Sequence, residues 1–81
     1  MNKRYYETSD MDFATVLYCL RIKLKDVRDD IEDKRRKVFV FEDDGKVAEL
    51  KIKFVNRELL VDPKALWEAT KTLKSLIYGE V

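Results

Sequence analysis

The chain has 81 residues, of which 41% are charged, with 17 lysines and arginines against 16 aspartates and glutamates. This length predicts one small domain, residues 1–81. The net charge of +1 says nothing by itself about nucleic-acid binding, so only the local distribution of charges is informative. There is no histidine and one cysteine, Cys19, which excludes a disulfide framework, and no apolar run is long enough to span a membrane.

The chain is predicted to begin with a short strand and an amphipathic helix. Tyr5 and Tyr6 in YYETSD favour an extended segment. Ser9 is placed to cap a helix that begins at Met11, and the Asp12 side chain can accept a hydrogen bond from the Ser9 backbone amide. Apolar residues then recur at spacings of three and four, which predicts one buried stripe on this helix: Phe13, Val16, Leu17 and Leu20.

Two strands are predicted to follow the first helix. RIKLKDVR alternates, with Ile22, Leu24 and Asp26 on one side, and KVFVFED is a second strand. The polar segment DDIEDKR between them predicts an antiparallel hairpin with a long loop. KVFVF is apolar on both faces, with Phe39 and Phe41 on one side, and we expect the protein's own helices to cover both faces.

The last element is predicted to be a helix in DPKALWEATKTLKSLIYG. Asp62 is the expected N-cap, Pro63 the first helical residue, and Gly79 the residue after its end. Its buried stripe should comprise Leu66, Ala69, Leu73, Leu76 and Ile77.

Residues 46–57 fit two structures. Asp44-Gly45 suits a hairpin turn, after which Ala48, Leu50, Ile52 and Phe54 alternate. The same segment forms an amphipathic helix, whose polar face comprises Lys46, Glu49, Lys53 and Arg57. The residues alone leave both structures open.

The fragments YYETSD, KVFVFED, FVNRELLVDP and LKSLIY, in this order, resemble a family of small uncharacterised domains. That family is catalogued as a domain of unknown function and occurs in prokaryotes and their phages and plasmids. The resemblance implies that FEDD leads into a helix over residues 47–56, and it brings no activity, cofactor or site residues. This chain has Arg21, Ile22 and Lys23 where such relatives usually place a glycine after the first helix. We therefore predict a small α+β domain with two or three antiparallel strands and three helices, in the order β-α-β-β-α-α.

Catalytic and metal sites are not expected. Without histidine a general base would have to be carboxylate or amine, and Cys19 has no partner to activate it. The acidic run from Asp26 to Asp33 lacks the ligand spacing and turn glycine of a calcium loop. We predict a protein that is not an enzyme, with no cofactor, metal, membrane partner or small-molecule substrate.

Two groups of cations are candidate contacts for nucleic acid. The first is the run of four consecutive cations Lys34, Arg35, Arg36 and Lys37, which can contact phosphates or can simply keep an apolar strand soluble. The second lies on the last helix, where one quarter of the helical wheel carries Lys64, Trp67, Lys71, Lys74 and Tyr78. The alternative for the second group is that Trp67 packs one edge into the core beneath lysine stems. A third candidate is the sheet face with Lys23 and Lys25.

The expected function is that of an accessory protein that binds DNA or RNA weakly and without strong sequence preference, through Lys34, Arg35, Arg36, Lys37, Lys64, Trp67, Lys71 and Lys74. The alternative is a protein-interaction or homodimerisation module of a mobile genetic element or its host, using the Phe39/Phe41 face or Trp67. The lack of a signal peptide and the lone cysteine predict a cytoplasmic protein. A charge-rich sequence without histidine or glutamine is typical of thermophilic proteins.

Overall fold

The computed structural model describes residues 4–79. Its elements, in chain order, are β1 (Arg4–Thr8), α1 (Met11–Cys19), β2 (Leu24–Asp29), β3 (Lys37–Asp43), α2 (Val47–Val55) and α3 (Pro63–Tyr78). The order β-α-β-β-α-α and the three-stranded antiparallel sheet confirm the predicted α+β fold. The predicted domain range of 1–81 includes residues 1–3 and 80–81, which lie outside the described residues.

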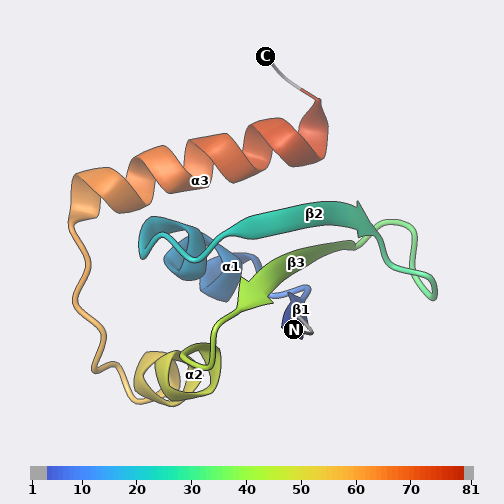
Figure 1. Ribbon diagram of the computed structural model, residues 1–81. Helices are drawn as coiled ribbons and strands as arrows, with labels where there is room; N and C mark the ends of the chain where they lie inside the picture. Colours follow the sequence, from blue (N-terminus) through green and yellow to red (C-terminus); the bar gives the residue numbers. More distant parts are fainter. Residues whose placement is uncertain (1–3, 80–81) are drawn as a thin grey trace.

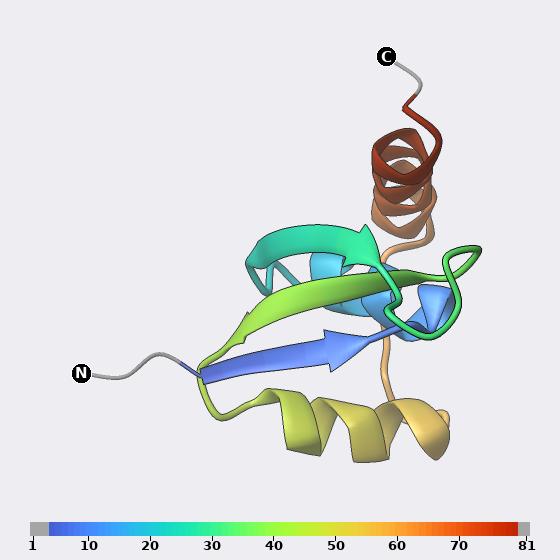
Figure 2. The same cartoon turned by 90° about the vertical axis from the view of Figure 1, so that its right-hand side faces the viewer.

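The sheet has the order β1-β3-β2, so that the most apolar strand lies in the centre (Figures 1 and 2). Phe39 of β3 is paired in register with Thr8 and Val27, and Phe39 and Val27 pack in the core formed with the helices. The predicted alternation of β2 is wrong at one point, because Leu24 and Asp26 oppose the successive residues Phe41 and Val40. The extra residue, Lys25, forms a bulge, and the bulge lets both Leu24 and Val27 pack on the core.

The core lies between the sheet and α1. Phe13, Ala14 and Leu17 of α1 are fully buried against Phe39 and Phe41 of β3. α2 adds Val47 and α3 adds Leu73, so that every helix supplies at least one fully buried side chain. Such a small shared core makes each of these side chains costly to remove.

Within residues 4–79 the opposite face of the sheet carries no helix (Figure 2), so the expected helical cover on both faces is wrong. Figure 2 shows the strands in front of α1, with α3 and α2 beyond the two edges of the sheet. Val38 and Val40 on this face are nevertheless only 9% exposed. Arg28 is paired in register with Val38, and Glu7 with Val40, and the ion pair between Arg28 and Glu7 reaches across β3 above them. Charged side chains therefore shield the valines where we expected a helix.

Helix α1 is capped by Asp10 and not by Ser9. The Asp10 carboxylate accepts hydrogen bonds from the backbone N–H groups of Asp12 and Phe13, at 3.0 and 3.3 Å. The backbone at Asp10 is extended (ψ 106°), which is the conformation that an N-cap requires. Beyond the helix, Arg21 has a positive φ of 67°, and Ile22 N–H donates to the Leu17 carbonyl at 3.0 Å. This is the helix-ending motif that usually takes glycine, and here an arginine occupies it.

The helix over residues 47–56 is confirmed as α2, and the alternative hairpin is wrong. Gly45 has a positive φ of 99°, and the side chains of Asp43 and Asp44 accept hydrogen bonds from the loop backbone. α2 then packs Val47, Leu50 and Phe54 on the core, and the ring centroids of Phe54 and Phe13 are 5.1 Å apart. A hairpin would leave these apolar side chains without this common partner.

Helix α3 begins as predicted. The Asp62 carboxylate accepts a hydrogen bond from Ala65 N–H at 2.9 Å, Pro63 is the first helical residue, and Gly79 ends the helix with a φ of 67°. Of its predicted buried stripe, Leu76 is wrong, because its side chain is 53% exposed. α3 packs on α1 beside the edge strand β2 (Figure 1). The strands do not lie over the outer side of α3, which faces away from α1 (Figure 1).

Candidate nucleic-acid interface

The outer side of α3 carries cations interleaved with aromatic rings, as the helical wheel predicts. Trp67 and Tyr78 are 68% and 69% exposed, and Trp67 is not among the residues that pack on the core, so the alternative that Trp67 packs an edge into the core is wrong. The inner side of the helix is held on α1 by Ala69 and Leu73, which fixes the opposite side towards solvent. We call the outer residues the α3 stripe: Lys64, Trp67, Lys71, Lys74 and Tyr78.

The three lysines of the α3 stripe have no ion-pair partner among residues 4–79. The sequence explains this, because Glu68 is the one carboxylate in α3 and it lies off the stripe, facing a groove on another side of the helix. An unpaired surface ammonium group keeps its full charge for an external anion. The stripe is therefore a row of available cations beside two exposed rings.

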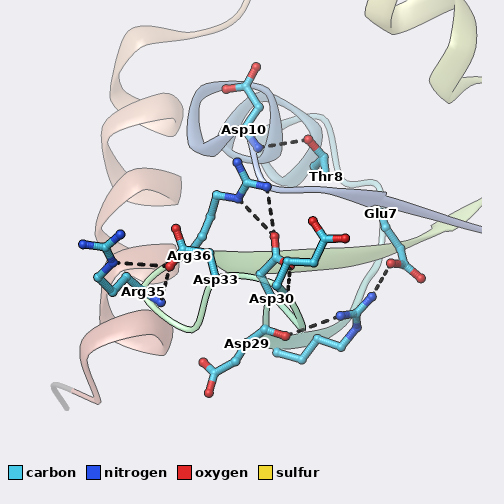
Figure 3. A network of polar contacts seen from close by, with 10 residues as sticks. Glu7, Thr8, Asp10, Asp29, Asp30, Asp33, Arg35 and Arg36 are labelled. Carbon is cyan, nitrogen blue, oxygen red and sulfur yellow. Dashed lines mark hydrogen bonds and ion pairs between the residues drawn. The ribbon is translucent and has the colours of Figure 1, made fainter.

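The four cations of residues 34–37 lie in the loop between β2 and β3 and at the start of β3. Figure 3 shows two of them, Arg35 and Arg36, beside their carboxylate partners. Three of the four are paired with nearby carboxylates. Arg36 donates from Nε and Nη2 to Asp30 Oδ2, at 3.1 and 3.0 Å. Arg35 Nε donates to Asp33 Oδ1 at 3.3 Å, and Lys37 pairs with Asp29. Lys34 alone of these cations has no ion-pair partner within the described chain.

These pairs also fix the backbone of the loop. Asp30 Oδ1 accepts a hydrogen bond from Glu32 N–H at 2.9 Å, and the backbones of Asp30 and Arg36 are joined by a further bond of 2.9 Å. The hydrogen bonds from Glu32 N–H and from the Arg36 side chain lower the pKa of Asp30. Most of the charge of this cluster therefore serves to hold the loop, and the cluster is a weaker site for anions than its sequence suggests.

The structure brings the two groups of cations together at one end of α3. A pocket of 250 Å³, the loop–α3 pocket, lies between the last turns of α3 and the β2–β3 loop. Within the described part of the chain its lining contains four cations and no carboxylate: Ser9, Met11, Arg35, Arg36, Lys37, Phe39, Lys74, Ile77 and Tyr78. Met11 and Ile77 could not be assigned to a site from the sequence, since they join it only through the packing of α3 beside the loop.

The other predicted surfaces are less suited to an anion. Lys23 pairs with Glu42, with 3.6 Å between the charged atoms. Phe39 and Phe41 are 1% and 0% exposed, because the helices cover their face of the sheet, so this face cannot serve as the dimer surface of the alternative function. A larger groove of 790 Å³ runs between α3 and the turn after α1. The half-buried Cys19 lines it together with cationic and anionic side chains, namely Arg21, Lys23 and Glu68.

Within residues 4–79, no cluster of three histidine, cysteine or carboxylate side chains has the arrangement of a metal site. None of the helices in the described residues has the length and apolar character to cross a membrane.

Comparison with known proteins gives one family. Residues 3–79 match a family described as a domain of unknown function (DUF5659), and the chain belongs to this family. Searches of curated proteins and of solved structures give no significant match.

Proposed function

We propose that this member of the family is a non-enzymatic protein that binds DNA or RNA weakly and with little sequence preference through the α3 stripe. The observation that carries the proposal is the row of three unpaired lysines interleaved with two exposed aromatic rings on one helix face. Lysines neutralise phosphates and release counterions, and rings stack on bases of any identity. Both contacts are independent of sequence.

The composition of α3 supports binding without sequence preference. Lysine can also contact guanine, but the planar side chains that hold two hydrogen bonds to one base edge in a fixed geometry are arginine, asparagine and glutamine. α3 contains none of these residues, and its polar side chains are lysine, threonine, serine and one glutamate. Contacts from lysine to phosphates position a nucleic acid without distinguishing its bases.

The β2–β3 loop has a secondary role in this proposal. Arg35, Arg36 and Lys37 keep their carboxylate partners, so they add little net charge to the surface. Lys34 is exposed and adds one available cation. We assign the main affinity to Lys64, Lys71 and Lys74, and orientation at the end of the helix to the loop.

The biological setting forms part of the same proposal. The resemblance to small domains of prokaryotes, phages and plasmids supports an accessory role in a mobile genetic element or its host. A single cysteine, half-buried and without a disulfide partner, suits the reducing cytoplasm, where nucleic acid is accessible. The surface ion pairs support a protein adapted to high temperature.

Titration of labelled oligonucleotides tests the proposal directly. Fluorescence anisotropy of single-stranded and duplex oligonucleotides at low salt should give dissociation constants of about 10⁻⁴ to 10⁻⁶ M, the range of non-specific binding. Several unrelated sequences should bind with similar affinity. The absence of binding to every oligonucleotide at about 1 mM protein, well above that range, would refute the proposal.

A second candidate function is self-association through α2. Ile52 and Val55 lie one turn apart on this helix, and their side chains are 63% and 65% exposed. Apolar side chains gathered on one face favour a protein contact. Sedimentation should then show a dimer that Ile52→Lys converts to monomer, and a wild-type monomer at about millimolar concentration would dismiss this candidate.

A further inference from the structure

We propose that the α3 stripe and the loop–α3 pocket together form a site for single-stranded nucleic acid, in which an unpaired base lies against Tyr78 and enters the pocket while Lys74 contacts the adjoining phosphate. This inference rests on the proposed function and specifies its ligand. It predicts that single strands bind more tightly than duplexes of the same sequence.

The first step is the exposure of the aromatic rings. Trp67 and Tyr78 each present most of their surface to solvent, at 68% and 69% exposure. They are eleven positions apart on α3, which places them about 16 Å apart along the helix axis. A ring can stack only on a base whose face is open, and bases within a duplex are covered on both faces by their neighbours. Two such rings on one helix therefore favour an unpaired strand.

The second step is the chemistry of the pocket beside Tyr78. Its apolar side chains are Met11, Phe39 and Ile77, and its polar rim includes Lys74 and Arg35. A nucleotide has the same division, with a flat apolar base and an anionic phosphate. Among residues 4–79 no carboxylate lines the pocket, so none of these side chains repels the phosphate there.

The third step concerns the arginine at the rim. The Arg35 side chain is 93% exposed, and its contact with Asp33 is made by Nε. A guanidinium group has five N–H donors, so the remaining ones stay available to a phosphate. Arg35 can therefore contact an anion without breaking the pair that supports the loop.

The chain provides its own reporter for the experiment. Trp67 is the single tryptophan in the sequence, and it lies on the α3 stripe. We would follow the quenching of its fluorescence by a short oligothymidylate and by the matching duplex. The test variant is Tyr78→Leu, which keeps an apolar side chain but removes the stacking ring. The control is Tyr5→Leu, since Tyr5 is also exposed but lies in the edge strand β1.

Tyr78→Leu should weaken single-strand binding by about 5- to 150-fold, the effect expected for the loss of one stacked base. Tyr5→Leu should leave that affinity unchanged, and duplex binding should change little in either variant. Circular dichroism first verifies that both variants are folded. An alternative polyanion, polyglutamate, is included as a competitor at equal charge.

The possible outcomes separate this inference from the proposed function. If single strands bind but Tyr78→Leu has no larger effect than Tyr5→Leu, the pocket is not a base site and the proposed function stands. Equal affinity for duplex, or equally effective competition by polyglutamate, likewise overturns the inference alone. If no oligonucleotide binds, both the proposed function and this inference are wrong.

Discussion

The salt dependence of binding provides the most quantitative test of the α3 stripe. Besides Lys25 of β2, which lies outside the proposed interface, four exposed lysines have no ion-pair partner within residues 4–79: Lys34, Lys64, Lys71 and Lys74. If each contacts one phosphate of a single strand, log K should fall with log salt with a slope of about −2.8, since each contact contributes about −0.7. The affinity should then drop about 50-fold between 50 and 200 mM salt.

The double variant Lys71→Ala/Lys74→Ala removes two of these contacts. Its slope should be about −1.4, and its affinity should drop only about 7-fold over the same range of salt. The matched control is Lys46→Ala/Lys53→Ala, which removes the same charge from lysines that already pair with Asp44 and Glu49. The control should retain the slope of the wild type. Fluorescence anisotropy at several salt concentrations gives all three slopes.

Equal slopes for the test and control variants would refute this reasoning. That result would mean that the protein binds through its total charge and that the position of the lysines on α3 is irrelevant. An unchanged slope in the double variant would mean that these lysines do not contact phosphates at all. Either result would remove the structural basis for assigning the interface to α3.

Four further predictions concern stability. Arg21→Gly and Arg57→Gly should each raise the free energy of unfolding by about 0.5–1 kcal/mol, because both arginines end a helix with positive φ (67° and 59°). Urea unfolding measures this free energy, and a decrease in either variant would contradict the prediction. Leu73→Ala should destabilise the protein by about 2–5 kcal/mol and Trp67→Ala by less than about 1, since Leu73 is fully buried and Trp67 is not; similar losses would show that Trp67 packs in the core. The pKa of Asp30 is lowered from 3.8 in the folded protein, so its carboxylate stabilises the fold above pH 3.8 and loses this effect as the pH falls through the lower value. Asp30→Asn should therefore reduce the difference between the urea midpoints at pH 7 and in acid. An unchanged difference would contradict the assignment. Thermal unfolding followed by circular dichroism should have its midpoint above about 65 °C, and a value between about 45 and 65 °C would contradict the thermophilic interpretation.

The helices could be predicted from sequence wherever their ends carry local signals. Asp62, Pro63 and Gly79 define α3 because an N-cap, a fixed φ and a left-handed residue act within one turn of the chain. The segment from Val47 to Val55 has no such advantage, since its apolar residues suit a strand and a helix equally. The helix is selected by contacts with Phe13, more than thirty positions away, and no local pattern contains them.

The bulge in β2 has the same explanation. Alternation in the sequence predicts a regular strand, but Leu24 and Val27 both pack on the core once Lys25 is left out of the register. The position of the bulge depends on the facing residues of β3. An alternating pattern within one strand therefore predicts the strand and leaves its register undetermined.

The candidate site divides in the same way. The α3 stripe follows from helical geometry alone, and its exposure needs only the knowledge that Ala69 and Leu73 face inwards. The state of the cations at residues 34–37 depends on how the loop closes. Closure brings Arg36 to Asp30 and Lys37 to Asp29, and a count of neighbouring charges does not specify those partners. The pocket is harder still, because it joins residues from α1, β3 and α3.

The separation of charges within a nearly neutral chain shows how the proposed weak binding could be localised. Carboxylates are concentrated in and around the β2–β3 hairpin, where Asp29, Asp30 and Asp33 neutralise adjacent cations. α3 has a single carboxylate, and its lysines remain unpaired in the described chain. At physiological salt, charges interact over only about 8 Å, so a polyanion on α3 responds to the helix and little to the remaining surface. A net charge of +1 then limits long-range attraction without preventing contact, and the affinity should depend on stacking as much as on phosphate.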